Sequence, residues 1–387
     1  MPARMKGASR VPEVRERHLL VVTTNYAETQ GGVEMHLRSL LPLLVARGVA
    51  VTVVYLGSDH EAWTEPSGVR VVPVPRRYDF RSIMALPSPR DWRALVRSVT
   101  GAQATPITHV ATHTRFFPLS WLGIRLARRR GVPSIHTEHG GGFVITSSPL
   151  VRVASRLVDR TMGRRVLRGA DRVLGVSDAA AEFVRKLSGV DAGVFGNGIA
   201  LRQWLPDEDL PPAIGNDRRL VFVGRVVEEK GWRTFVDVVA ACRAGGWRGE
   251  AWLIGPGELD AAQAYAAERG VEHLRSPGRL ESAEVRERLR GAVYVNPSIA
   301  AEGFQLTQLE ALAAGAALVT YEVGIASELA AISGARVAVV PPGDAEALIA
   351  AARQELERPA PRPRYEQFAA WDWDRLADRY VQELDRL

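Results

Sequence analysis

The stretch LVFVGRVVEEKGWRTFVDVVAACRAGGWRGEAWLIGPGE, residues 220–258, contains one complete strand–helix–strand unit. Residues 220–225 and 250–255 are mostly apolar, which predicts two buried strands, and the segment between them has the apolar pattern of a buried helix. Two strands separated by a helix of this length are expected to pair in parallel. The unit therefore predicts a parallel α/β sheet with helices on both faces.

The same alternation recurs along the chain in two series, separated by a Pro, Gly and Asp-rich connector at 195–219. A length of 387 residues also exceeds what one hydrophobic core usually serves. We expect two doubly wound domains with a cleft between them, at 1–200 and 201–370, and a final amphipathic helix within 371–387. The expected strands are 18–24, 49–57, 69–74, 108–113, 132–139 and 172–177 in the first series, and 220–225, 250–255, 271–278, 292–298, 316–322 and 336–343 in the second.

Composition limits the class of protein. An apolar content of 46% and a charged content of 24% are ordinary for a globular chain and argue against whole-chain disorder. Residues 1–17 contain no apolar core of the length a secretory signal needs, and no later run approaches about 18 apolar residues, so we expect a cytoplasmic protein. The single cysteine, Cys242, cannot form an internal disulfide, and we expect it to fill space in a buried helix.

Charge is divided unevenly between the two halves. Residues 1–200 hold 28 Lys and Arg against 15 Asp and Glu, whereas the remainder holds 22 against 29. The basic half is expected to meet an anionic membrane surface, nucleic acid or charged substrate, unless the two halves simply attract each other. One segment concentrates the positive charge at four-residue spacing: Arg152, Arg156, Arg160, Arg164, Arg168 and Arg172.

On one continuous helix, that spacing predicts a cationic stripe beside apolar residues, as in helices that rest on anionic headgroups. The segment could equally be a solvated face paired with acids elsewhere. Nucleic acid is not favoured, because no aromatic interleaving or reading motif accompanies the arginines.

Ligands of open parallel sheets bind beyond the carboxyl ends of the strands, so the loops there should carry the chemistry. Arg225 and Lys230 follow one predicted strand and could neutralise an anion such as a diphosphate at a helix start. Glu302 and Glu310 follow another strand, and each carboxylate suits a pair of neighbouring hydroxyls, as on a ribose or a hexose. Backbone N–H groups from Gly303 onward could face a phosphate.

Weaker signals lie in the neighbouring loops. Gly255 begins a Gly-Pro-Gly turn that lets backbone approach a ligand, and Ser276–Leu280 could offer backbone groups to a planar base or simply close a loop. Gly31 and Gly32 open a helix in the first half, although no G-x-G-x-x-G fingerprint is present there. The absence of that fingerprint argues against a Rossmann-type oxidoreductase.

The loop HTEHGGG, residues 136–142, presents histidines, a carboxylate and three glycines after a predicted strand. His139 or His136 could accept a proton or hydrogen-bond a sugar hydroxyl. We predict no metal site, because His109 and His113 lie in a strand-like context and Glu138 is the one nearby acid.

Three segments resemble one family. The stretches 175–199, 223–232 and 296–329 are similar to the nucleotide-sugar-dependent retaining glycosyltransferases of glycosyltransferase family 4, which have the GT-B fold. The most specific part is the pair of glutamates with seven residues between them, together with the Gly-Arg…Lys-Gly loop, in the family's order. The resemblance covers nearly the whole chain.

The resemblance implies roles for individual residues. Arg225 and Lys230 would neutralise the donor diphosphate in place of a metal, and Glu310 would hold the ribose hydroxyls. His139, with His136 as the second choice, would lie near the reacting carbon. The remaining implied donor contacts are Gly31, Gly32, Gly255, Arg279, Leu280, Glu302, Gly303, Phe304, Gln305 and Leu306.

The implied reaction moves a hexose-type sugar from a UDP- or GDP-sugar to an acceptor hydroxyl with retention, without a further cofactor. The resemblance also implies that the last helix packs back on the amino domain. A glycan, glycolipid or small-molecule acceptor fits, and a nucleotide-sugar epimerase of the same fold is the alternative. Two departures from the family pattern are Gln305, where glycine is common, and Ala200, where aspartate is usual.

Overall fold

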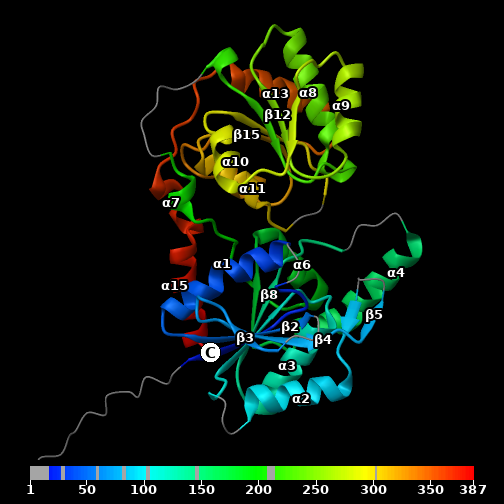
Figure 1. Ribbon diagram of the computed structural model, residues 1–387, viewed down its shortest axis with the longest axis vertical. Helices are drawn as coiled ribbons and strands as arrows, with labels where there is room; N and C mark the ends of the chain where they lie inside the picture. Colours follow the sequence, from blue (N-terminus) through cyan, green and yellow to red (C-terminus); the bar gives the residue numbers. More distant parts are fainter. Residues whose placement is uncertain are drawn as a thin grey trace, which may run out of the picture. The chain divides into compact units, whose positions relative to one another are not determined.

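The structure, a computed structural model, describes residues 17–27, 31–57, 61–80, 84–101, 105–143, 148–206, 214–300 and 303–387. Two compact units divide the chain: the first contains 1–112 and 117–135, and the second contains 113–116 and 136–387. Figure 1 labels some of the helices and strands of both.

An eight-stranded sheet is formed by residues before 195, with the strand order β10-β9-β8-β7-β1-β2-β4-β3. Every residue of β1 is buried, because helices cover the sheet on both faces. β1 pairs in parallel with β2 and β7, and Leu19 lies opposite Val51 and His109; β3 alone pairs antiparallel, with β4. The strands are β1 His18–Val22, β2 Ala50–Gly57, β3 Trp63–Thr64, β4 Arg70–Pro75, β7 His109–His113, β8 Ser134–Glu138, β9 Arg172–Gly175 and β10 Gly193–Val194.

The helices of this part follow its strands along the chain, and a short hairpin interrupts the series before α2. Ser88 caps α2 by accepting a hydrogen bond from the Asp91 N–H, as a serine before a helix commonly does. The helices are α1 Gly32–Ala46, α2 Pro89–Thr100, α3 Pro118–Arg130, α4 Pro149–Val158, α5 Arg164–Leu167 and α6 Asp178–Ser188, and the hairpin is β5 Tyr78–Phe80 with β6 Met84–Leu86.

A six-stranded parallel sheet follows, in the order β13-β12-β11-β14-β15-β16. Starting from β11, this is the 3-2-1-4-5-6 arrangement of a doubly wound fold. Alternate side chains of β11 enter different cores, because successive residues of a strand point to opposite faces: Leu220 and Phe222 pack with α8 and α9, and Val221 packs with α10 and α11. The strands are β11 Leu220–Val223, β12 Ala251–Ile254, β13 Arg275–Gly278, β14 Val293–Asn296, β15 Ala317–Tyr321 and β16 Val337–Val340.

The helices around this sheet lie on both of its faces (Figure 1). They are α8 Trp232–Ala244, α9 Leu259–Glu268, α10 Ser282–Leu289, α11 Leu306–Ala313, α12 Ala326–Ala330 and α13 Ala345–Leu356. The predicted fold class, two Rossmann-like parallel α/β sheets, is confirmed. Cys242 is buried in α8, as expected, and burial raises the pKa of its thiol to about 11.

The chain ends in α14, Tyr365–Phe368, and α15, Trp373–Asp385. α15 contacts the β9–β10 edge of the eight-stranded sheet: Arg172 Nε lies 2.7 Å from Glu383 Oε2, and the rings of Phe195 and Tyr380 are 5.4 Å apart. These contacts lie within the second unit. The domain boundaries at residues 200 and 370 stay a prediction.

Candidate active site

The loop after β11 carries the two predicted cations. Arg225 is exposed, and Lys230 ends a short 3-10 turn, Glu228–Lys230, that leads into α8. Gly231 closes the turn with φ = 75°, and a Cβ added there would lie 2.2 Å from the Pro297 carbonyl oxygen. Glycine is therefore required for both its left-handed backbone and its lack of a side chain. The turn fixes where Arg225 and Lys230 leave the backbone.

Neighbouring loops come together at the same edge of the sheet. Gly255 has φ = 138°, and its Cβ would lie 1.8 Å from the Gly224 carbonyl oxygen, so the loops after β11 and β12 touch backbone to backbone. The Gly255 N–H donates to the Gly278 carbonyl at 2.8 Å, which places the turn before Arg279 and Leu280 next to it. Arg279 is exposed, whereas Leu280 packs against the core. The structure thus brings these three predicted donor-binding loops to one edge, and a fourth joins them.

The fourth of these loops joins β14 to α11. The Ile299 N–H donates to the Glu229 carbonyl at 3.1 Å, which ties it to the loop of the two cations. Glu302 lies outside the described residues. Gly303 is buried, and a Cβ there would lie 2.3 Å from the His139 carbonyl oxygen, so these two predicted site residues adjoin within the second unit.

Glu310 lies in α11 and is partly buried. Burial raises the pKa of its carboxyl to about 7. Among the described residues, its side chain has no hydrogen-bond partner. Burying an acid without a partner is costly, and a ligand that offers hydroxyl donors would satisfy it.

Phe304 and Gln305 lead into α11, which begins at Leu306. The Gln305 side chain is buried and accepts a hydrogen bond from Asn296 Nδ2 at 2.6 Å; Asn296 Nδ2 also donates to Thr320 at 3.0 Å. A glycine has no side chain to join this network. The departure from the family's usual glycine therefore adds a buried, hydrogen-bonded side chain at position 305. Gln305 Nε2 is buried without a partner in the described part of the chain.

Sequence reasoning missed the other members of this network. Asn296 and Thr320 stand within apolar strand runs, and Gln308 lies on the buried face of α11. Gln308 Nε2 donates to Thr320 at 3.2 Å and to the Val323 carbonyl at 3.3 Å. The available signal was a polar residue inside each apolar run, since buried polar groups are usually hydrogen-bonded.

The first three residues of the predicted histidine loop, 136–138, belong to β8, and the rest of the loop follows this strand. His139 Nε2 lies 3.1 Å from His113 Nδ1, and His139 is only partly buried. His136 is fully buried, and its Nε2 lies 3.7 Å from Glu138 Oε2. This placement favours His139 over His136 as the histidine that meets a ligand.

A buried charge cluster holds this loop in place. Arg115 Nη1 lies 2.7 Å from Glu138 Oε1, and its Nε lies 3.0 Å from Asp159 Oδ1; all three side chains are almost completely buried. Arg115 Nη2 also donates to the Gly142 carbonyl at 3.0 Å, and the Gly140 N–H donates to Glu138 at 2.8 Å. Arg115 and Asp159 were not predicted as site residues, because they are distant in sequence and belong to no motif.

Electrostatics differ between the two acids of the cluster. Burial opposes ionisation of Glu138, but Arg115, His136 and the Arg115 N–H outweigh it and lower the pKa of Glu138 to about 2. Burial raises the pKa of Asp159 despite the attraction of Arg115. Glu138 is therefore the firmly ionised partner of Arg115.

Gly31 and Gly32 lie at the start of α1, in the first unit. A Cβ on Gly31 would lie 2.6 Å from Glu34 Oε2, whereas nothing lies within 4 Å of a Cβ on Gly32. Gly31 caps α1 without a side-chain hydrogen bond. This end of α1 can receive a ligand at its backbone N–H groups.

The prediction that the arginines from Arg152 to Arg172 share one helix holds only as far as Leu167. A π-helical turn, Asp159–Gly163, joins α4 to α5 without a break in the helical backbone, and the buried Asp159 of this turn pairs with Arg115. Arg164 and Arg168 then donate to the carbonyls of Leu187 and Ser188, and Arg172 lies in β9. The helical part of the arginine series therefore ends before Arg172.

The α4 part of this segment has an exposed apolar stripe. Leu150, Val153 and Leu157 of α4 are 79%, 67% and 63% exposed. Arg156 and Arg160 lie nearby, 5.5 and 6.0 Å from the centre of the Phe143 ring. We call this surface the α4 face.

Neither a metal cluster nor a membrane-spanning helix is found in the described ranges. No group of three His, Cys, Asp or Glu side chains among these residues is arranged to hold a metal ion. No helix there has the length and apolar character needed to cross a bilayer.

Glu310 leads to a prediction about pH. Its pKa is raised from 4.5 to about 7 in the folded protein. As pH rises, the Glu310 carboxyl therefore loses its proton at a lower pH in the unfolded chain than in the folded protein. We expect Glu310 to contribute stability at low pH and to lose that contribution between about pH 4.5 and 7, whereas Glu310→Gln should lack this component. Chemical denaturation of both proteins from pH 4.5 to 8 measures it. If the stabilities of the wild type and Glu310→Gln changed in parallel over this pH range, the raised pKa of Glu310 would be contradicted.

Comparisons with known proteins agree with the observed fold. The family model Glycosyltransferase Family 4 matches residues 30–203, and Glycosyl transferases group 1 matches residues 217–358. Phosphatidyl-myo-inositol mannosyltransferase of Mycobacterium tuberculosis is 25% identical over 301 residues, 76% of this chain and 75% of that protein. An uncharacterised glycosyltransferase of Methanocaldococcus jannaschii is 30% identical over 129 residues, 32% of this chain and 33% of that protein.

Solved structures share the fold. Sucrose-phosphate synthase from Thermosynechococcus elongatus has a TM-score of 0.69 at 19% identity, over 96% of this chain and 99% of that chain. The Anabaena protein HepE in complex with UDP has a TM-score of 0.70 at 14% identity, over 96% of this chain and all of that one. Together with the two family matches, this places the chain among the GT-B-fold glycosyltransferases of glycosyltransferase family 4.

Proposed function

We propose that the protein transfers a hexose-type sugar from a UDP- or GDP-sugar to an acceptor hydroxyl, with retention of the anomeric configuration and without a metal. The observation that carries this proposal is the set of four touching loops at one edge of the six-stranded sheet, with Arg225, Lys230 and Gly255 among them. The partly buried Glu310 carboxyl, without a hydrogen-bond partner in the described part of the chain, supplies the complementary feature for a polyol.

Each loop has a role in this proposal. Arg225 and Lys230 bind the donor diphosphate and stabilise the negative charge that develops on it as the bond to the sugar breaks. Glu310 accepts hydrogen bonds from the ribose hydroxyls, and the turn before Arg279 and Leu280 borders the base. Glu302 and the start of α11 hold the donor sugar.

The proton and the bonds balance without a protein nucleophile. The bond between the anomeric carbon and the diphosphate oxygen breaks, and the acceptor oxygen bonds that carbon on the same face. The departing diphosphate oxygen takes the proton of the acceptor hydroxyl. His139 lies beside the reacting carbon and hydrogen-bonds the sugar, with its ring oriented by His113 at 3.1 Å.

A membrane acceptor at the inner face of the cell membrane is the version we favour. The α4 face combines exposed leucine and valine side chains with arginines, as a helix resting on anionic lipid does. The mycobacterial relatives are named for a phosphatidyl-myo-inositol acceptor, which is a lipid. We therefore propose a role in glycolipid or cell-envelope glycan synthesis, with a small-molecule acceptor as the second candidate.

Nucleotide release tests the function directly. UDP-, GDP-, ADP- and dTDP-sugars are incubated with the protein, with and without anionic liposomes that carry cell-envelope lipids. We expect slow hydrolysis of one donor, faster turnover with an acceptor lipid, and a product of retained configuration by NMR. Turnover of no sugar nucleotide would overturn the proposal, and isomerisation of the donor sugar without an acceptor would indicate an epimerase.

The α4 face is tested in the same assay. Leu150→Ser, Val153→Ser and Leu157→Ser together remove its apolar stripe, and we expect liposome partitioning to fall about tenfold or more, because each buried CH₂ contributes about 0.8 kcal/mol. Met35→Ser, which alters an exposed apolar side chain of α1, is the control. Equal partitioning of the triple variant and the wild type would remove the α4 face from the proposal.

A further inference from the structure

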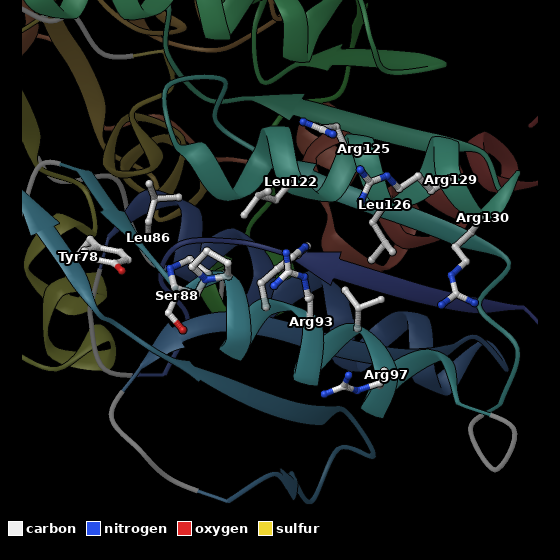
Figure 2. Close-up of a pocket in the computed structure, with 14 residues that line it drawn as sticks. Tyr78, Leu86, Ser88, Arg93, Arg97, Leu122, Arg125, Leu126, Arg129 and Arg130 are labelled. Carbon is white, nitrogen blue, oxygen red and sulfur yellow. The ribbon is translucent and has the colours of Figure 1, made fainter.

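A second candidate site lies in the first unit, in a groove between α2 and α3 (Figure 2). Its volume is about 660 Å³, within the range of pockets that hold drug-sized ligands. The groove lies on the face of the eight-stranded sheet where Leu95 of α2 and Leu119 of α3 enter a common core. Apolar side chains form its floor: Leu86, Trp92, Val96, Leu122 and Leu126.

Five arginines surround this floor. Figure 2 shows Arg93 and Arg97 on α2, and Arg125, Arg129 and Arg130 on α3, with Leu122 and Leu126 between the two groups. Positive charge therefore comes from both walls of the groove.

The described part of the chain offers these arginines no carboxylate. Asp91 of α2 is engaged elsewhere, since it accepts a hydrogen bond from Ser88 Oγ at 2.6 Å and pairs with Arg77 at 3.3 Å. Arg125 stacks over the Trp121 ring at 4.5 Å, and Arg130 donates to the Thr100 hydroxyl. No ion pair to any of the five rim arginines is found in those residues.

This arrangement is unfavourable without a ligand. Arg93 and Arg97 are four residues apart on one helix, as are Arg125 and Arg129, and like charges at this spacing repel each other. An apolar floor open to water costs further free energy. A molecule with a hydrocarbon part and an anionic group would relieve both costs.

We propose that the groove binds an anionic phospholipid. One acyl chain lies on the apolar floor that contains Trp92 and Leu126, and the phosphate lies between the arginines of α2 and α3. Charge complementarity selects the head group, and the apolar floor selects the chain. This lipid is neither the sugar donor nor the acceptor. The site goes beyond the proposed transfer reaction, and its binding can be measured without any sugar nucleotide.

Short-chain lipids separate binding in the groove from adsorption to a surface. Dioctanoyl-phosphatidylglycerol and dioctanoyl-phosphatidylcholine, both below the concentrations at which they form micelles, are titrated into the full-length protein by calorimetry. We expect saturable binding of one phosphatidylglycerol, at least about tenfold tighter than phosphatidylcholine, and weaker binding as salt rises. Equal affinity for the two lipids would overturn the proposal.

Charge reversal provides a matched pair of variants. Arg97→Glu with Arg129→Glu changes one arginine on each wall, and we expect phosphatidylglycerol affinity to fall at least about tenfold. Arg90→Glu with Arg128→Glu makes the same charge change on the same two helices at exposed positions outside the groove. Equal losses in the two double variants would mean that net charge, not the groove, binds the lipid.

The acyl chain is located by fluorescence. Phosphatidylglycerol with brominated acyl chains should quench Trp92, so the quenched fraction should be smaller in Trp92→Phe, provided that calorimetry shows this variant still binds lipid. Quenching that is unchanged in Trp92→Phe would place the chain elsewhere and overturn the proposal. Inorganic phosphate that displaced the brominated lipid as effectively as unlabelled phosphatidylglycerol does would also overturn the proposal, because the apolar floor would then contribute nothing to binding.

Discussion

Replacing Arg225 and Lys230 together with alanine is expected to lower kcat/KM for the nucleotide sugar by about 10³-fold or more. Each cation is proposed to contact the diphosphate, and the loss of one group that stabilises developing charge typically costs 10²–10³-fold. The loop itself should survive, because its geometry depends on Gly231, Gly224 and Gly255 and not on the two side chains. Steady-state kinetics with the donor identified by the nucleotide panel measures the effect.

The split between kcat and KM distinguishes two roles for these cations. A lower kcat with little change in KM means that the charges act mainly on the departing diphosphate, whereas a higher KM alone means that they only bind the ground state. Arg248→Ala with Arg269→Ala is the matched control, because both arginines are exposed and precede strands at the other edge of this sheet. A double variant of Arg225 and Lys230 that retained wild-type kinetics would contradict the proposed diphosphate site.

The six-stranded sheet and its loops could be predicted because their information is local. Residues 220–258 carry a strand, a helix and a strand in sequence order, and the observed β11, α8 and β12 fall in those positions. Gly231 and Gly255 could also be singled out, since a glycine after a strand often marks close backbone approach. The structure adds the reason for each: Gly231 packs against Pro297, and Gly255 against Gly224.

The features that were not predicted depend on side chains distant in sequence. Arg115 meets Asp159, 44 residues away, and neither residue belongs to a pattern that would link them. The arginine periodicity likewise carried no signal for the π-helical turn at Asp159–Gly163 or for the end of the helix at Leu167. The α2–α3 groove could likewise not be predicted from the sequence, because two helices from different parts of the first unit form its walls.

Replacing Arg115 with methionine is expected to destabilise the protein by about 3–5 kcal/mol, the usual cost of removing one partner from a buried ion pair. Methionine keeps an apolar stem like that of arginine but leaves Glu138 and Asp159 buried without their cation. It also removes the hydrogen bond to the Gly142 carbonyl, so the loop that bears His139 loses one of its supports. Urea denaturation at pH 7 measures the loss, and Arg115→Lys should show an intermediate loss, because an ammonium group cannot form the same fork of contacts.

The dependence of this loss on pH separates electrostatics from packing. In the wild type, the pKa of Glu138 is lowered from 4.5 to about 2, so its contribution to stability is present above about pH 4.5 and is lost as pH falls toward 2. Without Arg115, the main attraction that lowers this pKa is gone, and protonation removes the unpaired charge. The difference in stability between the wild type and Arg115→Met should therefore shrink below about pH 4.5, and adding Glu138→Gln and Asp159→Asn to Arg115→Met should recover part of the loss at pH 7. A difference that stays constant with pH, with no recovery in the triple variant, would mean that Arg115 acts through packing alone.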